Sequence, residues 1–338
     1  RNTVAGTNAG DSFTGTDAID NTLFGYDAGT AITTGDYNVS IGSYALDAST
    51  TGMRNIAVGY TALSANTTAD NNTSVGYESL LTNTTGYSNV GVGNYTLRNG
   101  TTAYLNNAFG YQALYSVTTG NRNQAFGAGC LDANTTGSYN TAVGHEALTE
   151  NTTANDNAAF GFQALKVNTT GTNNTALGTY ALIANTTANN NTAVGTYALY
   201  QNTTGTNNVA IGYQALDACT TSVSNVCIGN GAGGAITTGN GENVCIGNNC
   251  AAAMTTAQQN IIIGDNAAAG AAVTGNLNVI VGDNAAYALT TGGSNTVVGG
   301  SAFAANTTGG ENVAIGYQAL TANTTADQNT AVGWYALK

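Results

Sequence analysis

The sequence predicts an all-β fold, a parallel β-solenoid of about twenty rungs with a 17-residue repeat. The first observation is the period, because an Asn opens every copy at a spacing of seventeen, except nineteen after Asn2 and eighteen after Asn225 and Asn260. This unit is too short for helical-pair repeats, which need about 33 residues or more. The second is a Gly at the fifth place of each rung and a recurring Thr-Thr pair, both poor helix formers. The third is the absence of proline, which cannot donate to a hydrogen-bond ladder.

Places are counted from the opening Asn of each rung. The opening asparagines are Asn2, Asn21, Asn38, Asn55, Asn72, Asn89, Asn106, Asn123, Asn140, Asn157, Asn174, Asn191, Asn208, Asn225, Asn243, Asn260, Asn278, Asn295, Asn312 and Asn329. Stacked at about 4.8 Å, twenty such rungs would form a rod on the order of 95 Å long.

The first four places read as a strand whose side chains alternate between two faces. The fourth place holds Val, Ile, Leu or Phe, as in Val58 and Phe109, and we expect this column to point into a core. The third place is mostly Ala and therefore faces the other way. A face of small residues would allow close approach by another sheet or another chain.

The rest of the rung follows from its residue types. Glycine at the fifth place marks a corner where a positive φ or a close backbone contact excludes a Cβ. We expect a second strand at Tyr-x-Ala-Leu, as in Tyr60–Leu63, followed by a polar Asn-Thr-Thr loop. The opening Asn predicts an amide ladder in which each side chain bonds the backbone and the next copy, because buried amides must be satisfied.

The chain divides by regularity. Residues 1–20 form an irregular first rung or cap, residues 21–224 are regular rungs, and residues 225–294 are variant rungs that carry both single-residue insertions within the same solenoid. Residues 295–338 return to the regular pattern and stop within a rung. Since the chain starts directly before a repeat and stops inside one, we expect it to be a segment of a longer protein.

Charge excludes several function classes. Only 7% of the residues are charged, and 6 Lys+Arg against 18 Asp+Glu leave a net charge of −12. Nucleic-acid binding relies on clustered Lys and Arg, so nucleic acid is not an expected partner. No apolar run approaches the roughly 20 residues of a membrane span, so membrane insertion is not expected. With His145 as the one histidine, we expect no enzyme, no metal site and no cofactor.

The element Asn-x-Ala-(Val/Ile)-Gly-x-x-Ala, as in Asn208–Ala215 and Asn312–Ala319, resembles the head repeats of trimeric autotransporter adhesins. It is also similar to repeats of bacterial and phage tail-fibre-like proteins. The resemblance extends over residues 21–338. It implies a left-handed parallel β-roll that is commonly a trimer with its small-residue faces inward.

Two sets of residues are candidate sites. An N-x-T sequon recurs at the twelfth place and would carry a row of N-linked glycans in a glycosylating secretory route; alternatively, Asn and Thr are simply the residues of a duplicated loop. The sequon asparagines are Asn66, Asn83, Asn134, Asn151, Asn168, Asn185, Asn202, Asn306 and Asn323. Aromatic residues at the sixth place would form a surface that stacks on a ligand, or would only stabilise the stack. These aromatic candidates are Tyr60, Tyr77, Tyr111, Tyr213, Tyr317 and Trp334.

The five cysteines have no CxxC spacing and are expected to be small buried residues. A bridge between Cys227 and Cys245 would fit poorly on neighbouring parallel strands, whereas Cys219 lies in the loop and is a candidate crosslink. Cation binding by Asp265 and Asp283 and ice binding by the Thr columns are weaker alternatives.

The sequence thus predicts a structural fibre or filament segment, extracellular or on the cell surface, that assembles with itself. The homo-oligomer would be a head-to-tail filament or a trimer through the Ala faces. The alternative is an adhesin or tail-fibre-like module that recognises glycans or a host surface. Glycan binding that is lost on Tyr→Ala substitution would favour the module, whereas a fibre that binds no glycan would favour the scaffold.

Overall fold

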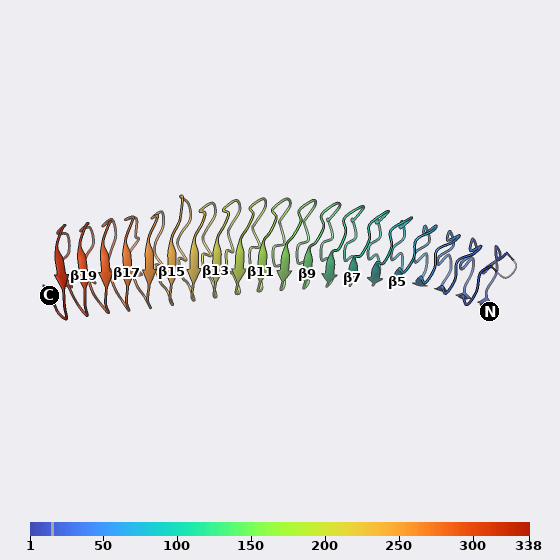
Figure 1. Cartoon of the computed structure of the whole chain (residues 1–338), viewed down its shortest axis with the longest axis horizontal. Coiled ribbons are helices and arrows are strands. Elements are labelled where there is room, and N and C mark those ends of the chain that lie inside the picture. The colour runs from blue at the N-terminus through green and yellow to red at the C-terminus, as the bar shows by residue number, and fades with distance from the viewer. Residues whose placement is uncertain (15–16) are drawn as a thin grey trace. The chain divides into compact units, whose positions relative to one another are not determined.

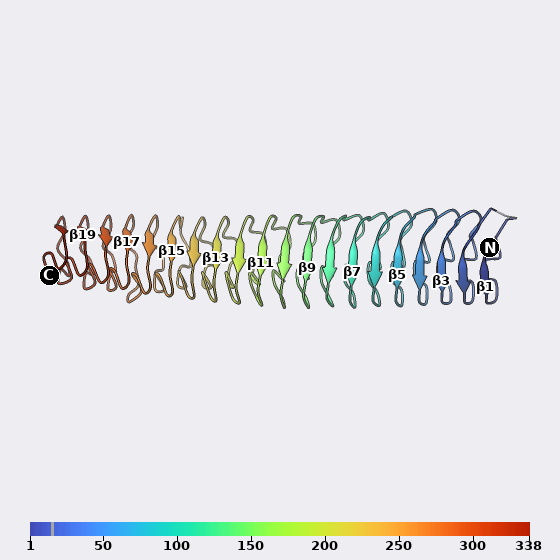
Figure 2. The same cartoon turned by 60° about the horizontal axis from the view of Figure 1, so that its bottom comes forward.

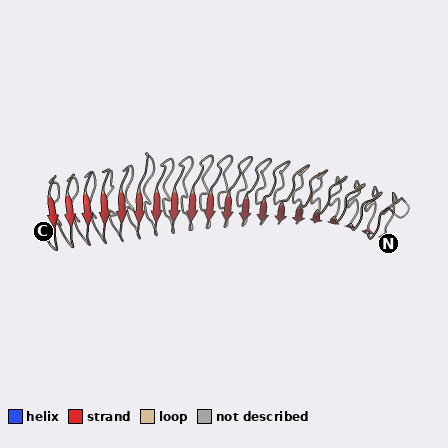
Figure 3. Cartoon of the chain, in the orientation of Figure 1, coloured by secondary structure: helices blue, strands red, loops and turns tan. Residues whose placement is uncertain are grey.

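The computed structural model describes residues 1–14 and 17–338 and has the predicted all-β, parallel solenoid fold. Each turn of the coil contributes one three-residue strand, and the described residues form twenty of them and no helix (Figure 3). Positions 15 and 16 of the expected N-terminal cap lie outside the described residues. The chain groups into two compact units, residues 1–170 and residues 171–338, which are treated separately below.

The first unit contains the strands β1 to β10, which lie side by side along it (Figure 1). Their bounds are Thr3–Ala5, Thr22–Phe24, Val39–Ile41, Ile56–Val58, Thr73–Val75, Val90–Val92, Asn107–Phe109, Gln124–Phe126, Thr141–Val143 and Ala158–Phe160. Successive strands pair in parallel and in register, so that Thr73 lies opposite Val90 and Val75 opposite Val92. Like places therefore form columns along the unit.

The second unit contains the strands β11 to β20, and both views show them on one side of the coil (Figures 1 and 2). Their bounds are Thr175–Leu177, Thr192–Val194, Val209–Ile211, Val226–Ile228, Val244–Ile246, Ile261–Ile263, Val279–Val281, Thr296–Val298, Val313–Ile315 and Thr330–Val332. The insertions of the variant rungs leave the strand register intact, because Val226 still lies opposite Val244 and Ile261 opposite Val279. The extra residues are absorbed in loops.

The two faces of each strand are oriented opposite to the prediction, because the third place is buried and the fourth place faces outward. The third-place side chains, such as Ala57 and Ala108, are 0% exposed, whereas fourth-place Phe109 and Phe126 are 36% and 41% exposed. The physical reason is the narrow interior. A Cβ added at third-place Gly91 would lie 2.7 Å from Ser79 Oγ and 3.3 Å from a Leu80 methyl carbon, so places 8 and 9 leave room only for a small residue.

The predicted second strand is also wrong. Places 6 to 11 form tight turns, with left-handed backbone at the seventh and ninth places, as at Thr61 (φ 49°) and Leu63 (φ 55°). Local hydrogen bonds close these turns, as from the Ala62 N–H to the Gly59 carbonyl (3.4 Å). The turn carries the buried Ala and Leu of places 8 and 9 into the core opposite the strand.

The structure confirms that the fifth-place glycines form corners, with both a positive φ and a close backbone contact. Gly59 has φ of 137°, and a Cβ there would lie 2.3 Å from the backbone oxygen of Gly76 in the next rung. The left-handed backbone and the close rung-to-rung approach each exclude a side chain.

The predicted asparagine ladder is confirmed. Asn38 Oδ1 accepts the backbone N–H of Asn55 (2.9 Å), and Asn55 Nδ2 donates to the Ala69 carbonyl of its own rung (2.9 Å). Asn55 Oδ1 in turn accepts the backbone N–H of Asn72 (2.9 Å). The opening Asn thus pairs buried backbone groups that no strand partner reaches, which explains why this place never varies in the chain.

Candidate functional site

The outer face of the sheet has no charged side chain; it is apolar at place 4, whereas place 2 also holds Thr in several strands, Asn107 and Gln124. It consists of the side chains at places 2 and 4 of each rung, the first and last residues of the strand, which point away from the buried third place. We call these side chains the sheet face. In β13 to β19 they are nearly all aliphatic and exposed or half-buried: Val209, Ile211, Val226, Ile228, Val244, Ile246, Ile261, Ile263, Val279, Val281, Val298, Val313 and Ile315.

A second surface is a ladder of tyrosines in the first unit, at places 6 and 7. Their rings contact one another from rung to rung, with centroids 5.3 to 6.1 Å apart. This tyrosine ladder consists of Tyr26, Tyr44, Tyr60, Tyr77, Tyr95 and Tyr111. The candidates Tyr60 and Tyr111 remain 47% and 53% exposed, so the rings both stabilise the stack and present a surface.

The other aromatic candidates lie in the second unit. Tyr213 contacts Tyr197 edge-on, with centroids 6.2 Å apart, and Tyr317 contacts Tyr335 at 5.7 Å. Trp334 packs edge-on against Tyr335 at 4.5 Å. All three candidates of this unit are exposed.

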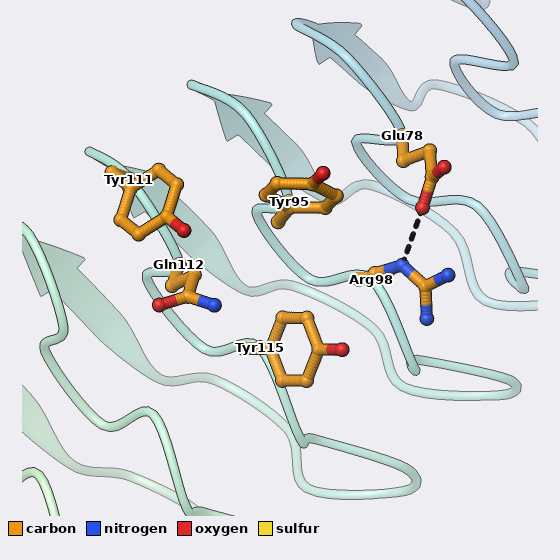
Figure 4. Close-up of a pocket in the computed structure, with 6 residues that line it drawn as sticks. All are labelled: Glu78, Tyr95, Arg98, Tyr111, Gln112 and Tyr115. Carbon is orange, nitrogen blue, oxygen red and sulfur yellow. Dashed lines mark hydrogen bonds and ion pairs between the residues drawn. The ribbon is translucent and has the colours of Figure 1, made fainter.

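Beside the ladder lies a hollow of about 400 Å³, shown in Figure 4. We call it the Arg98 groove, and it is lined by Glu78, Tyr95, Arg98, Tyr111, Gln112 and Tyr115. Arg98 Nε donates to Glu78 Oε2 (2.7 Å), and the guanidinium carbon lies 5.8 Å from the centroid of the Tyr115 ring. The ion pair holds the arginine beside Tyr95 and Tyr115, on the side of the hollow away from Tyr111 (Figure 4).

The charge state of this pair follows from its contacts. Burial disfavours the Glu78 carboxylate, but hydrogen bonds from Arg98 and Tyr77 outweigh that effect and lower the pKa of Glu78. The hydrogen bond to Glu78 raises the pKa of Arg98. Both groups are therefore ionised at neutral pH.

This pair was not predicted from the sequence, because Glu78 and Arg98 lie in different rungs and are twenty residues apart. In register, Glu78 stands at place 7 and Arg98 at place 10 of the next rung. Glu146 and Lys166 repeat this arrangement, with Lys166 Nζ 2.7 Å from Glu146 Oε2. An acid at place 7 followed twenty residues later by a base was the signal that would have found both pairs.

The sequon asparagines lie mainly in the core. Eight of the nine are 0% exposed, and Asn323 is the half-exposed exception. Asn151 Nδ2 donates to Asn134 Oδ1 (2.9 Å) and to the Ala154 carbonyl (3.2 Å), so the twelfth place forms a second, discontinuous amide ladder. A buried, hydrogen-bonded amide offers no room for a sugar on the folded chain, and this burial favours the reading that Asn belongs to the loop's architecture.

All five cysteines are buried free thiols, as expected, and Cys227 and Cys245 are unbridged. Cys219, the candidate for a crosslink, is 0% exposed, and this burial argues against a crosslink there. Burial raises the pKa of Cys130 to about 11 and that of Cys219 to about 12. Since the thiolate is the reactive form, these thiols are inert in the folded chain.

Two further findings concern the described residues. They contain no group of three or more His, Cys, Asp or Glu side chains placed to hold a metal ion. The part of the chain that the structure describes also has no helix with the length and apolar character of a membrane span. Comparison with protein-family models and with curated proteins finds no match.

Proposed function

We propose that this chain is a self-associating structural segment of an extracellular fibre, and that copies meet through the sheet face. The observation that carries the proposal is the uncharged surface of places 2 and 4, which is nearly all aliphatic in β13 to β19. Monomeric soluble proteins rarely expose large contiguous apolar patches, and such patches mark interaction sites. The extracellular location rests on the resemblance of the repeats to adhesin heads and tail-fibre-like proteins.

The partner that best fits this face is a second copy of the chain. The net charge of −12 makes two copies repel wherever their carboxylates approach. Places 2 and 4 carry no Asp, Glu, Lys or Arg in any of the twenty strands, so two copies can approach here without placing like charges together. The identical rung spacing of the two copies also lets their side chains interdigitate along the contact.

The available area is sufficient. With strands about 10 Å long and about 4.8 Å apart, the ten strands of each unit present roughly 480 Å² in flat projection, or roughly 960 Å² summed over the two units. A stable interface buries about 800 Å² per partner. The proposal replaces the expected trimer through Ala faces, because Ala57, Ala108 and the other third-place alanines are buried in their own core.

Sedimentation velocity over a range of protein concentrations tests this proposal. We expect the wild-type chain to associate and Ile246→Lys, at the end of β15, to weaken association about tenfold or more, since a buried lysine would lose its hydration. Thr256→Lys is the matched control, because it adds the same charge to an exposed loop position of the same rung. A wild-type chain that stays monomeric throughout, or equal weakening by both variants, would refute the proposed role.

A further inference from the structure

We propose that the Arg98 groove is a binding site for a neutral oligosaccharide. This inference goes beyond the structural role and does not depend on it, because the groove lies at places 6, 7 and 10 and the proposed contact between copies lies at places 2 and 4. The volume of about 400 Å³ is within the range of small-ligand sites, about 300 to 1,000 Å³.

The walls of the groove are aromatic. Tyr95 and Tyr111 contact each other edge-on, with centroids 5.9 Å apart and planes at 83°, so the two rings present surfaces in two directions. Tyr115 forms the opposite wall (Figure 4). Sugar rings have apolar C–H faces, and flat aromatic rings provide contact area for them at little cost in side-chain entropy.

Polar groups also line the groove and provide the donors and acceptors that sugar hydroxyls need. Arg98 supplies N–H donors, Gln112 supplies both a donor and an acceptor, and Glu78 supplies carboxylate acceptors. The ion pair between Arg98 and Glu78 holds both side chains in place before a ligand arrives. A preorganised site of this kind loses less conformational entropy on binding.

The groove continues into a second hollow of about 220 Å³, and the two share Tyr111 and Gln112. Asp132, Glu146 and Thr149 line the continuation and extend the row of hydroxyl-binding groups. The shared residues make one elongated site, which fits a chain of sugar units better than a single sugar.

The charges select a neutral ligand. Arg98 is paired with Glu78 and Lys166 with Glu146, so neither base is left to pair with an acidic sugar. Asp132 adds a further carboxyl group to the lining, in a chain of net charge −12. A sialylated or uronic-acid glycan would therefore be repelled from this site.

An array of neutral and sialylated oligosaccharides, followed by calorimetric titration of the neutral glycan that binds most strongly, tests the proposal. We expect the wild-type chain to bind neutral oligosaccharides and Tyr111→Ala to reduce the affinity about tenfold. Tyr60→Ala is the matched control, because Tyr60 has the same place in the rung and similar exposure but lies outside the groove. It should leave the affinity unchanged.

Arg98→Gln provides a second test that leaves the aromatic walls intact, and it should also reduce the affinity about tenfold. Circular dichroism of each variant establishes that it is folded. The proposal is overturned if the wild-type chain binds no neutral glycan, if it prefers sialylated glycans, or if Tyr60→Ala reduces the affinity as much as Tyr111→Ala. Sedimentation of the same variants separates these outcomes from a failure of self-association.

Discussion

Replacing an opening asparagine by alanine should lower the free energy of unfolding most in a rung that has no second asparagine at place 12. Asn106→Ala removes the Oδ1 atom that accepts the Asn123 backbone N–H (2.9 Å) and the Nδ2 atom that donates to the Gly120 carbonyl (2.9 Å). Place 12 of this rung is Val117, which offers no replacement donor. Two buried backbone groups are left unpaired, at about 1 to 3 kcal/mol each. We expect the free energy of unfolding to fall by about 2 to 6 kcal/mol.

Asn123→Ala is the matched comparison in the next rung. It leaves the Asn140 backbone N–H unpaired, but the Gly137 carbonyl keeps the hydrogen bond from Asn134 Nδ2 (2.9 Å). Only one backbone group is left unpaired, so the expected loss is about 1 to 3 kcal/mol. The difference between the two variants tests the hydrogen-bond assignment independently of the volume removed, which is the same in both.

The assay is urea unfolding followed by circular dichroism, combined with hydrogen exchange read by mass spectrometry. Repeat arrays need not unfold in one step, so exchange is needed to show whether the protection lost lies in the rungs around residue 106. Equal losses in the two variants, or a loss below about 0.5 kcal/mol for Asn106→Ala, would refute the reasoning.

Three further predictions concern single residues. Asn306 is 0% exposed and its side-chain amide has no hydrogen-bond partner. Asn306→Leu should therefore raise the free energy of unfolding in urea by about 1 kcal/mol or more. Asn151→Leu removes a side-chain amide that is hydrogen-bonded and should lower the free energy of unfolding. Gly110→Ala should lower the melting temperature strongly, because Gly110 has φ of 128° and the added Cβ would lie 2.7 Å from the backbone of the next corner glycine, Gly127. In Gly100→Ala the nearest atom to the added Cβ would be 3.3 Å away, so the melting temperature should change little. Burial raises the pKa of Cys130 from 9.0 to about 11, so its contribution to stability is complete below pH 9 and is lost as the pH rises towards 11. Cys130→Ala should therefore show a smaller loss of stability than the wild-type chain between pH 9 and 11, and an identical loss would contradict the assignment.

The period and residue chemistry predicted the elements that repeat without variation. A spacing of seventeen gave the rungs and their register, the fifth-place glycines gave the corners, and the invariant asparagine gave the ladder. Each of these follows from a local requirement of the backbone: a positive φ, or a buried group that must be paired.

The direction of the strand faces could not be predicted in the same way. Alternation shows that Ala57 and Val58 point to opposite sides, but it does not show which side is closed. That depends on the width of the interior, which the turn at places 6 to 11 determines through the side chain of Leu63. Assigning the larger residue to the core is a sound rule for wide sheets and fails in a coil whose interior is filled from the turn.

The candidate sites show the same limit. The exposed tyrosines were predicted from their place in the rung, and the structure adds that they form a ladder. The Arg98 groove was not predicted, because it joins three rungs through side chains that are far apart in the sequence. The sequons were visible as a motif, but their burial became clear only when place 12 was seen to face the core.

Hydroxyl-radical footprinting read by mass spectrometry tests most directly whether the sheet face joins copies of the chain. Phe109 and Phe126 are reactive reporters on this face, and Tyr60 and Tyr213 are exposed reporters on the turn edge. We predict that the two phenylalanines are labelled in dilute solution and protected at concentrations where the chain associates, while the two tyrosines are labelled equally in both. Association that leaves both phenylalanines labelled would contradict the account.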